Sequence, residues 1–205
     1  EGILMDPAKV KAIVALAAPE NLGDLRTFLG AAGFYRRFVE KFSFISAPLS
    51  DLTRGGVPFL WLEFHQSAFE KLKHALTTAP VLHPPDMSKP FHVYSDASIV
   101  AVGGALMQWT GEGKDSAANL APVAYASRVL SQTERNWPTH ERELFAIVYC
   151  FKKFRSYLLG SQFSTTSRTD HQSLQYFPTQ KDLSAKQARW LEFLAEFDFQ
   201  CKYVE

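Results

Sequence analysis

The fold is decided first by the stretch FHVYSDAS at residues 91–98. Its opening residues are mostly aromatic and β-branched, which predicts a strand that ends at the carboxylate of Asp96. Two further acids occupy related settings. Glu143 opens a helix-like run, and Asp170 follows a strand-like run and precedes a predicted helix start.

These three acids are too far apart in the sequence to meet through local structure. A β-β-β-α-β order brings them together, because strand ends gather at one rim of a sheet. Clustered carboxylates repel one another at neutral pH unless cations lie between them. The pattern therefore favours a divalent-metal site for phosphodiester chemistry. Each acid also has an ordinary structural explanation: a turn for Asp96, a helix-dipole acid for Glu143 and a helix cap for Asp170.

Composition limits the class of protein. The 205 residues suffice for one large domain or two small ones, and 46% are hydrophobic, which is enough for a packed core. The formal net charge of +1 gives no sign of nucleic-acid binding, so any such site must come from local patches.

The cysteines and the apolar runs bear on the compartment. Cys150 lies in an apolar helical run and Cys201 in a predicted strand, and two buried free thiols suit a reducing environment. Neither a signal peptide nor an apolar run of membrane-spanning length is visible. We expect an intracellular protein of the cytoplasm, the nucleus or both, with no membrane partner. The first residue is not Met, so we also expect a piece of a longer protein.

Residues 1–85 predict a small all-helical segment. Asp6 and Asn21 are good N-caps for the first two helices. A third helix is expected over residues 44–52, broken at Pro48, and a fourth after Trp61, with Phe64 on its apolar stripe. Four prolines between residues 80 and 90 then predict a linker.

Residues 86–205 predict an α/β layered domain in the order β-β-β-α-β-α-α-β. Expected strands cover residues 91–95, 102–108, 122–127, 162–169 and 199–204, and expected helices include 138–159 and 185–197. The fourth strand is weak, because its Ser-Thr-Thr-Ser-Arg run has almost nothing apolar to bury.

A series of short segments then carries a resemblance. In order and spacing they are similar to the C-terminal part of the reverse transcriptase of gypsy-type LTR retrotransposons, where a helical tail is followed by a ribonuclease H domain. The segments are residues 2–13, FLG at 28–30, FYRRF at 34–38, APL at 47–49, AFEKLK at 68–73, SDAS at 95–98, AYASR at 124–128, EREL at 141–144 and TDH at 169–171.

The resemblance implies a fold and an activity. Residues 1–85 would be a thumb/connection segment that grips the template–primer duplex, and residues 86–205 an RNase H-like mixed sheet. The domain would hydrolyse the RNA strand of RNA–DNA hybrids with two Mg²⁺ ions, for which Mn²⁺ could substitute. Asp96, Glu143 and Asp170 would be its catalytic acids and metal ligands. Its partners would be the hybrid or duplex and the remainder of the reverse transcriptase polyprotein.

The chain also departs from the family pattern. It ends before a segment that supplies a fourth acid, so we expect weaker metal binding and slow cleavage. The segment from Phe163 to Asp170 is longer than in the family, which predicts a bulge that displaces Asp170. The palm is absent, so this chain is not expected to polymerise DNA.

Candidate nucleic-acid contacts are spread over both parts. Arg36, Arg37 and Lys41 form a basic cluster beside aromatic residues, which suits phosphate contacts, although a charged outer helix face explains it equally well. Further candidates, by their place beside the motifs, are Ser98, Arg128 and His171.

Three functions compete. The leading hypothesis is a hybrid-cleaving ribonuclease within an RNA-directed DNA polymerase polyprotein. The alternative is a catalytically weak or dead RNase H-like remnant that binds nucleic acid or protein. A third, DNA strand transfer on the same fold, is disfavoured by the thumb-like helical segment.

Overall fold

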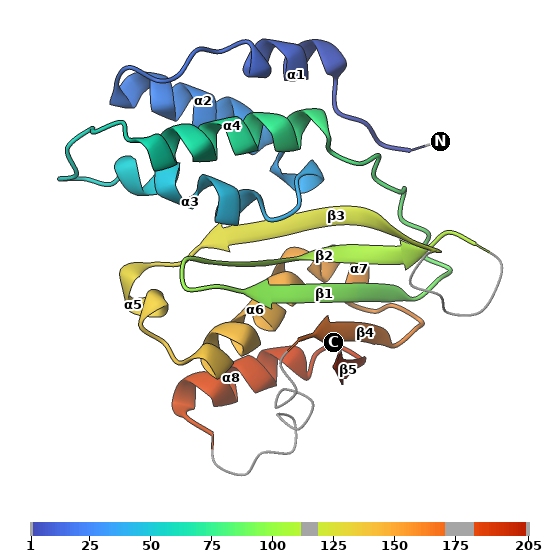
Figure 1. Ribbon diagram of the computed structural model, residues 1–205. Coiled ribbons are helices and arrows are strands. Elements are labelled where there is room, and N and C mark those ends of the chain that lie inside the picture. The colour runs from blue at the N-terminus through green and yellow to red at the C-terminus, as the bar shows by residue number, and fades with distance from the viewer. Residues whose placement is uncertain (1, 112–118, 171–182, 204–205) are drawn as a thin grey trace.

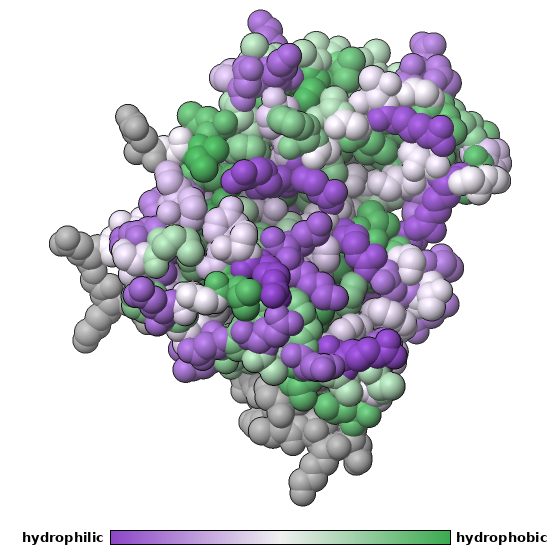
Figure 2. Space-filling view, turned by 180° about the vertical axis from the view of Figure 1, so that it is seen from behind, coloured by the Kyte–Doolittle hydropathy of each residue, from purple (hydrophilic) through white to green (hydrophobic). Residues whose placement is uncertain are grey.

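A computed structural model describes residues 2–111, 119–170 and 183–203. A group of helices from the first part of the chain lies above one side of a mixed sheet, and helices from the second part lie against the other side (Figure 1). Hydrophilic side chains gather across the middle of the face seen in Figure 2, with apolar ones above and below them. Among the described residues, none of the helices combines the length and apolar character that a membrane crossing requires.

The first part of the chain is helical, as predicted. Asp6 accepts a hydrogen bond from the Ala8 N–H at 2.9 Å, and Asn21 accepts one from the Asp24 N–H at 3.0 Å, so both predicted caps are confirmed. The elements are α1 (Pro7–Val14), α2 (Leu22–Phe34), the 3₁₀ helix η1 (Arg36–Phe38), α3 (Phe42–Leu52) and α4 (Glu63–Thr77).

Two details of this helical segment correct the prediction. α3 continues through Pro48, because Leu49 and Leu52 beyond it are buried and their packing outweighs the lost backbone hydrogen bond. Phe64 is 55% exposed, and α4 turns His65 and Phe69 inward instead. The core of the helical segment is assembled around fully buried side chains: Leu25, Phe28, Leu49, Phe69 and Leu72.

The second part is a five-stranded mixed sheet in the order β3-β2-β1-β4-β5. β1 pairs antiparallel with β2 and parallel with β4, and β4 pairs parallel with β5. The strands are β1 (Phe91–Ala97), β2 (Ala101–Trp109), β3 (Leu120–Val129), β4 (Thr165–Thr169) and β5 (Phe199–Tyr203).

The helices of this part follow the predicted order with small differences. They are α5 (Gln132–Arg135), α6 (Thr139–Lys153), α7 (Arg155–Leu158) and α8 (Ala185–Leu194). The single helix expected over 138–159 is interrupted at Phe154, which leaves α-helical geometry. A further helix expected between the fourth and fifth strands falls on residues 171–182, outside the described residues.

β4 corrects the prediction of a weak, bulged strand. Thr165, Ser167 and Thr169 are all at least 98% buried. Each residue of β4 pairs in turn with one residue of β5, and its middle pairs one-to-one with β1. Because both edges of the strand are hydrogen-bonded to neighbours, its backbone needs no help from apolar side chains, and small hydroxyl residues fit the tight space.

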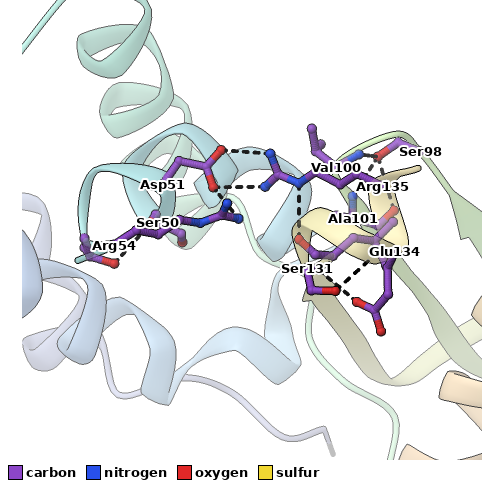
Figure 3. Close-up of polar contacts among 11 residues, drawn as sticks. Ser50, Asp51, Arg54, Ser98, Val100, Ala101, Ser131, Glu134 and Arg135 are labelled. Carbon is purple, nitrogen blue, oxygen red and sulfur yellow. Dashed lines mark hydrogen bonds and ion pairs between the residues drawn. The ribbon is translucent and has the colours of Figure 1, made fainter. Parts of the chain in front are cut away.

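The helical segment is fixed to the sheet by polar contacts. The Arg36 guanidinium donates to the Ser127 carbonyl at 2.5 Å, and the Ser43 N–H donates to Ser127 Oγ at 2.8 Å. Arg135 forms two hydrogen bonds to Asp51, at 2.9 and 3.1 Å (Figure 3). These contacts join residues more than eighty positions apart in the sequence.

Candidate active site

Two of the predicted acids lie at one rim of the sheet. Asp96 is near the end of β1, and Asp170 directly follows β4. The two strands run parallel with Tyr94 opposite Arg168, so the residues two positions further on reach the same edge.

Glu143 approaches the same rim from below the sheet. It lies near the start of α6, which packs against β1, and it is only 6% exposed. The Ala97 N–H donates to its carboxylate, while its Oε2 atom has no hydrogen-bond partner. Burial raises the pKa of Glu143 to about 7, and the negative charges of Asp170 and Asp96 add to that rise.

A lysine of the helical segment pairs with one of these acids. Lys41 Nζ lies 2.5 Å from Asp96 Oδ2, and this hydrogen bond raises the pKa of Lys41. Sequence reasoning placed Lys41 among phosphate contacts and did not pair it with Asp96. Nothing in the local sequence signals the pair, because it depends on how the helical segment lies on the sheet.

The donor chemistry is that of a hard divalent cation. Carboxylate oxygens are what Mg²⁺ and Mn²⁺ prefer, and the unpartnered Glu143 Oε2 and the ammonium at Asp96 mark a place where positive charge is stabilised. In this arrangement, however, no three His, Cys, Asp or Glu side chains of residues 2–111, 119–170 and 183–203 are grouped closely enough to hold one ion. A metal held by these acids would therefore require the carboxylates to move closer together.

A pocket of about 390 Å³ opens beside Asp96 and Asp170. Its wall is formed by the helical segment and its floor by the sheet, where the Arg168 guanidinium lies 5.5 Å from the centre of the Tyr94 ring. The lining residues are Glu40, Lys41 and Phe44 on the wall, and Tyr94, Ser95, Asp96, Gly103, Gly104, Ala105, Arg168, Thr169 and Asp170 on the sheet. Sequence reasoning missed Tyr94 and Arg168, although strand alternation puts both on the face of Asp96.

The predicted basic cluster does not lie on one helix face. α2 ends before Arg36, and the arginines fall on η1. Arg36 is engaged with Ser127 and Ser43, while Arg37 is exposed and lies over the Phe38 ring at 5.6 Å. Of this cluster, Arg37 keeps its charge most available to a phosphate.

The remaining nucleic-acid candidates have structural partners or lie outside the described residues. Ser98 Oγ accepts from the N–H groups of Val100 and Ala101 and so closes the turn between β1 and β2 (Figure 3). Arg128 pairs with Glu134 at 2.7 Å. His171 is among the residues that the structure does not describe.

Comparison with known proteins defines the class. Residues 86–197 match the family model described as an RNase H-like domain found in reverse transcriptase. The chain therefore belongs to this family of RNase H-like domains, and the mixed α/β fold agrees with the prediction.

Individual relatives are retroelement polyproteins, as the resemblance predicted. The chain is 38% identical over 207 residues to the retrovirus-related Pol polyprotein from transposon 297 of Drosophila melanogaster, covering 100% of this chain and 18% of that protein. It is 34% identical to the corresponding polyprotein from transposon gypsy, covering 99% of this chain and 20% of that protein. The chain thus spans only about a fifth of the length of these curated relatives.

Solved structures extend the likeness to the helical segment. The foamy viral protease–reverse transcriptase in complex with double-stranded DNA matches with a TM-score of 0.74 and 25% identity, over 98% of this chain and 42% of that one. The same viral protein in complex with an RNA/DNA hybrid matches with a TM-score of 0.73 and 25% identity, over 98% of this chain and 27% of that one. Both matches therefore include the helices as well as the sheet.

Proposed function

We propose that this RNase H-like domain hydrolyses the RNA strand of RNA–DNA hybrids as part of a reverse transcriptase polyprotein. The observation that carries the proposal is the buried Glu143 carboxylate, whose Oε2 atom has no hydrogen-bond partner, near the rim that Asp96 and Asp170 share. Three acids near one rim repel one another and gain nothing in stability from it, so the arrangement supports a site for a divalent cation.

The three acids would hold the metal ions, and the backbone around them would orient their carboxylates. Two bound Mg²⁺ or Mn²⁺ ions would activate water and stabilise the leaving oxygen. Asp96 and Asp170 project from neighbouring parallel strands, and the Ala97 N–H fixes one side of Glu143 so that its unpartnered oxygen remains available as a ligand. A bound cation also favours the ionised form of Glu143 at neutral pH.

The substrate is proposed from the relatives. The matched viral protein is described in complex with double-stranded DNA and with an RNA/DNA hybrid, which supports a hybrid or template–primer duplex as the ligand here. The two separate apolar cores support a division into a thumb/connection segment, residues 1–85, and the RNase H-like domain, residues 86–205. Exposed Arg37 is the best-placed phosphate contact of the predicted cluster.

Cleavage of a labelled RNA–DNA hybrid in Mg²⁺ or Mn²⁺ tests the proposal. Wild-type protein should cut only the RNA strand, and Asp96→Asn should lose at least about a hundredfold in rate, as expected when a metal ligand is removed. Asp86→Asn is the matched control, because Asp86 is a half-buried aspartate just before β1 that does not line the pocket beside Asp96. Equal cleavage by wild-type protein and Asp96→Asn would contradict the assignment.

A second function is favoured by two observations. Lys41 pairs with Asp96, and the described acids are not grouped to hold an ion as they stand. A binding module without cleavage would retain both features. It predicts hybrid binding that Asp96→Asn leaves unchanged, together with no cleavage in Mn²⁺.

A further inference from the structure

The residue that deepens this proposal is Lys41, which belongs to the helical segment and not to the RNase H-like domain. Its ammonium is 2.5 Å from Asp96 Oδ2, with the lysine side chain 53% exposed and the aspartate side chain 35% exposed. An ion pair this exposed is usually weak, unless the backbone that carries it is held in place.

The backbone of Lys41 is held in an uncommon conformation. Its φ of 54° and ψ of 28° are left-handed, and it is the one residue other than glycine with positive φ within the described part of the chain. Such a conformation is unfavourable for a side chain with a Cβ and persists where surrounding contacts fix it.

Contacts on both sides of Lys41 supply that fixation. Before it, Arg36 donates to the Ser127 carbonyl; after it, the Ser43 N–H donates to Ser127 Oγ. Phe38 and Phe42 are buried between these anchors. Since β3 is paired with β2 and β2 with β1, the turn is fixed relative to the strand that carries Asp96.

The charges around this pair are mostly negative. Glu40 and Asp170 line the same pocket, and Glu143 lies behind Asp96. Lys41 therefore supplies positive charge at the point where a metal ion would bind Asp96. The Lys41 ammonium and a divalent ion would repel each other, so both cannot bind Asp96 Oδ2 at the same time.

We propose that Lys41 is an internal cation that competes with divalent metal ions for Asp96 and so lowers the metal affinity of the candidate site. This inference rests on the proposed function, because it requires that Asp96 bind a metal. Metal binding would then release the lysine side chain toward the pocket and solvent, where a nucleic-acid phosphate is the natural partner for an ammonium.

The test is to measure Mn²⁺ binding to the whole chain in the absence of nucleic acid. Calorimetry gives the affinity, and electron paramagnetic resonance detects the bound ion. Lys41→Gln should bind Mn²⁺ about two- to fivefold more tightly than wild type, the range that an exposed ion pair implies. Lys41→Arg should restore the wild-type affinity because it keeps the charge. Lys71→Gln is the matched control: Lys71 is an exposed lysine of α4 that lines a neighbouring pocket and forms no ion pair with Asp96.

The outcomes separate this inference from the proposed function. If wild-type protein binds Mn²⁺ in an Asp96-dependent way and Lys41→Gln binds no more tightly, the competition is wrong while the metal site stands. If Lys71→Gln tightens Mn²⁺ binding as much as Lys41→Gln, the change in affinity comes from net charge and not from the Lys41–Asp96 contact, and the inference is wrong. If no variant with Asp96 intact binds Mn²⁺, both the inference and the metal site are wrong. Thermal unfolding of each variant shows that it is folded.

Discussion

The two faces of the sheet are held in different ways. Against one face, α6 and α8 bury an apolar core that includes Val93, Leu106 and Phe151. Against the other, α3 and η1 are fixed by polar contacts to Ser127 and by the Arg135–Asp51 pair, while Tyr125 of β3 packs against the apolar core of the helical segment. The apolar face provides stability, whereas the polar face sets where the helical segment lies and brings Lys41 to Asp96.

The largest effect should come from breaking the apolar face. Phe151 is fully buried and touches Phe197 and Phe199 at ring distances of 5.2 and 4.9 Å. Phe151→Ala should lower the free energy of unfolding by about 3–5 kcal/mol, because it leaves a cavity. Denaturant unfolding measures this. Phe34→Ala, at a side chain that is 79% exposed, should change stability by less than about 0.5 kcal/mol.

Glu143→Gln should stabilise the protein at high pH. The pKa of Glu143 is raised from 4.5 to about 7 in the folded protein, so the folded state binds a proton more tightly than the unfolded chain. Stability from this group is therefore lost as pH rises from about 4.5 to 7 and stays lost above that. The variant should gain about 2 kcal/mol at pH 8 and almost nothing at pH 4.

Thermal unfolding at both pH values, without divalent metal, checks this prediction. Equal stabilisation at pH 4 and pH 8 would instead point to side-chain packing. Added Mn²⁺ should narrow the difference in stability between Glu143→Gln and wild type at pH 8, because a bound cation also relieves the repulsion among the three carboxylates.

The polar face should give a smaller, salt-dependent effect. A double-mutant cycle on Arg135 and Asp51 should show a coupling energy of about 1 kcal/mol that weakens in high salt. Arg54 pairs with the same aspartate at 2.8 Å but is 39% exposed, against 14% for Arg135 (Figure 3). The Arg54–Asp51 cycle should therefore give less than about 0.5 kcal/mol. Equal coupling energies in the two cycles would show that the burial of Arg135 does not strengthen its ion pair with Asp51.

Sequence reasoning succeeded where the pattern is local. Asp6 and Asn21 cap the helices that follow them, and the strands around Val93 and Leu106 are apolar enough to predict. The three acids were also singled out from sequence, and the parallel pairing of β1 with β4 explains why two of them reach one rim.

Sequence reasoning failed where tertiary contacts override local preference. β4 is hydrophilic in sequence, yet Ser167 is completely buried because neighbouring strands satisfy its backbone on both sides. Pro48 predicts a break that packing of Leu49 prevents. The pair between Lys41 and Asp96 depends on the polar face of the sheet, and no periodicity in either segment encodes it.

The central claim is that Asp96, Glu143 and Asp170 form one metal site. Anomalous diffraction from crystals soaked in Mn²⁺ tests it most directly. The account predicts manganese peaks within coordination distance of the Asp96 carboxylate, with Lys41 displaced from it, and no such peak in Asp96→Asn. Manganese bound only elsewhere, with Lys41 still paired to Asp96 at saturating metal, would contradict it.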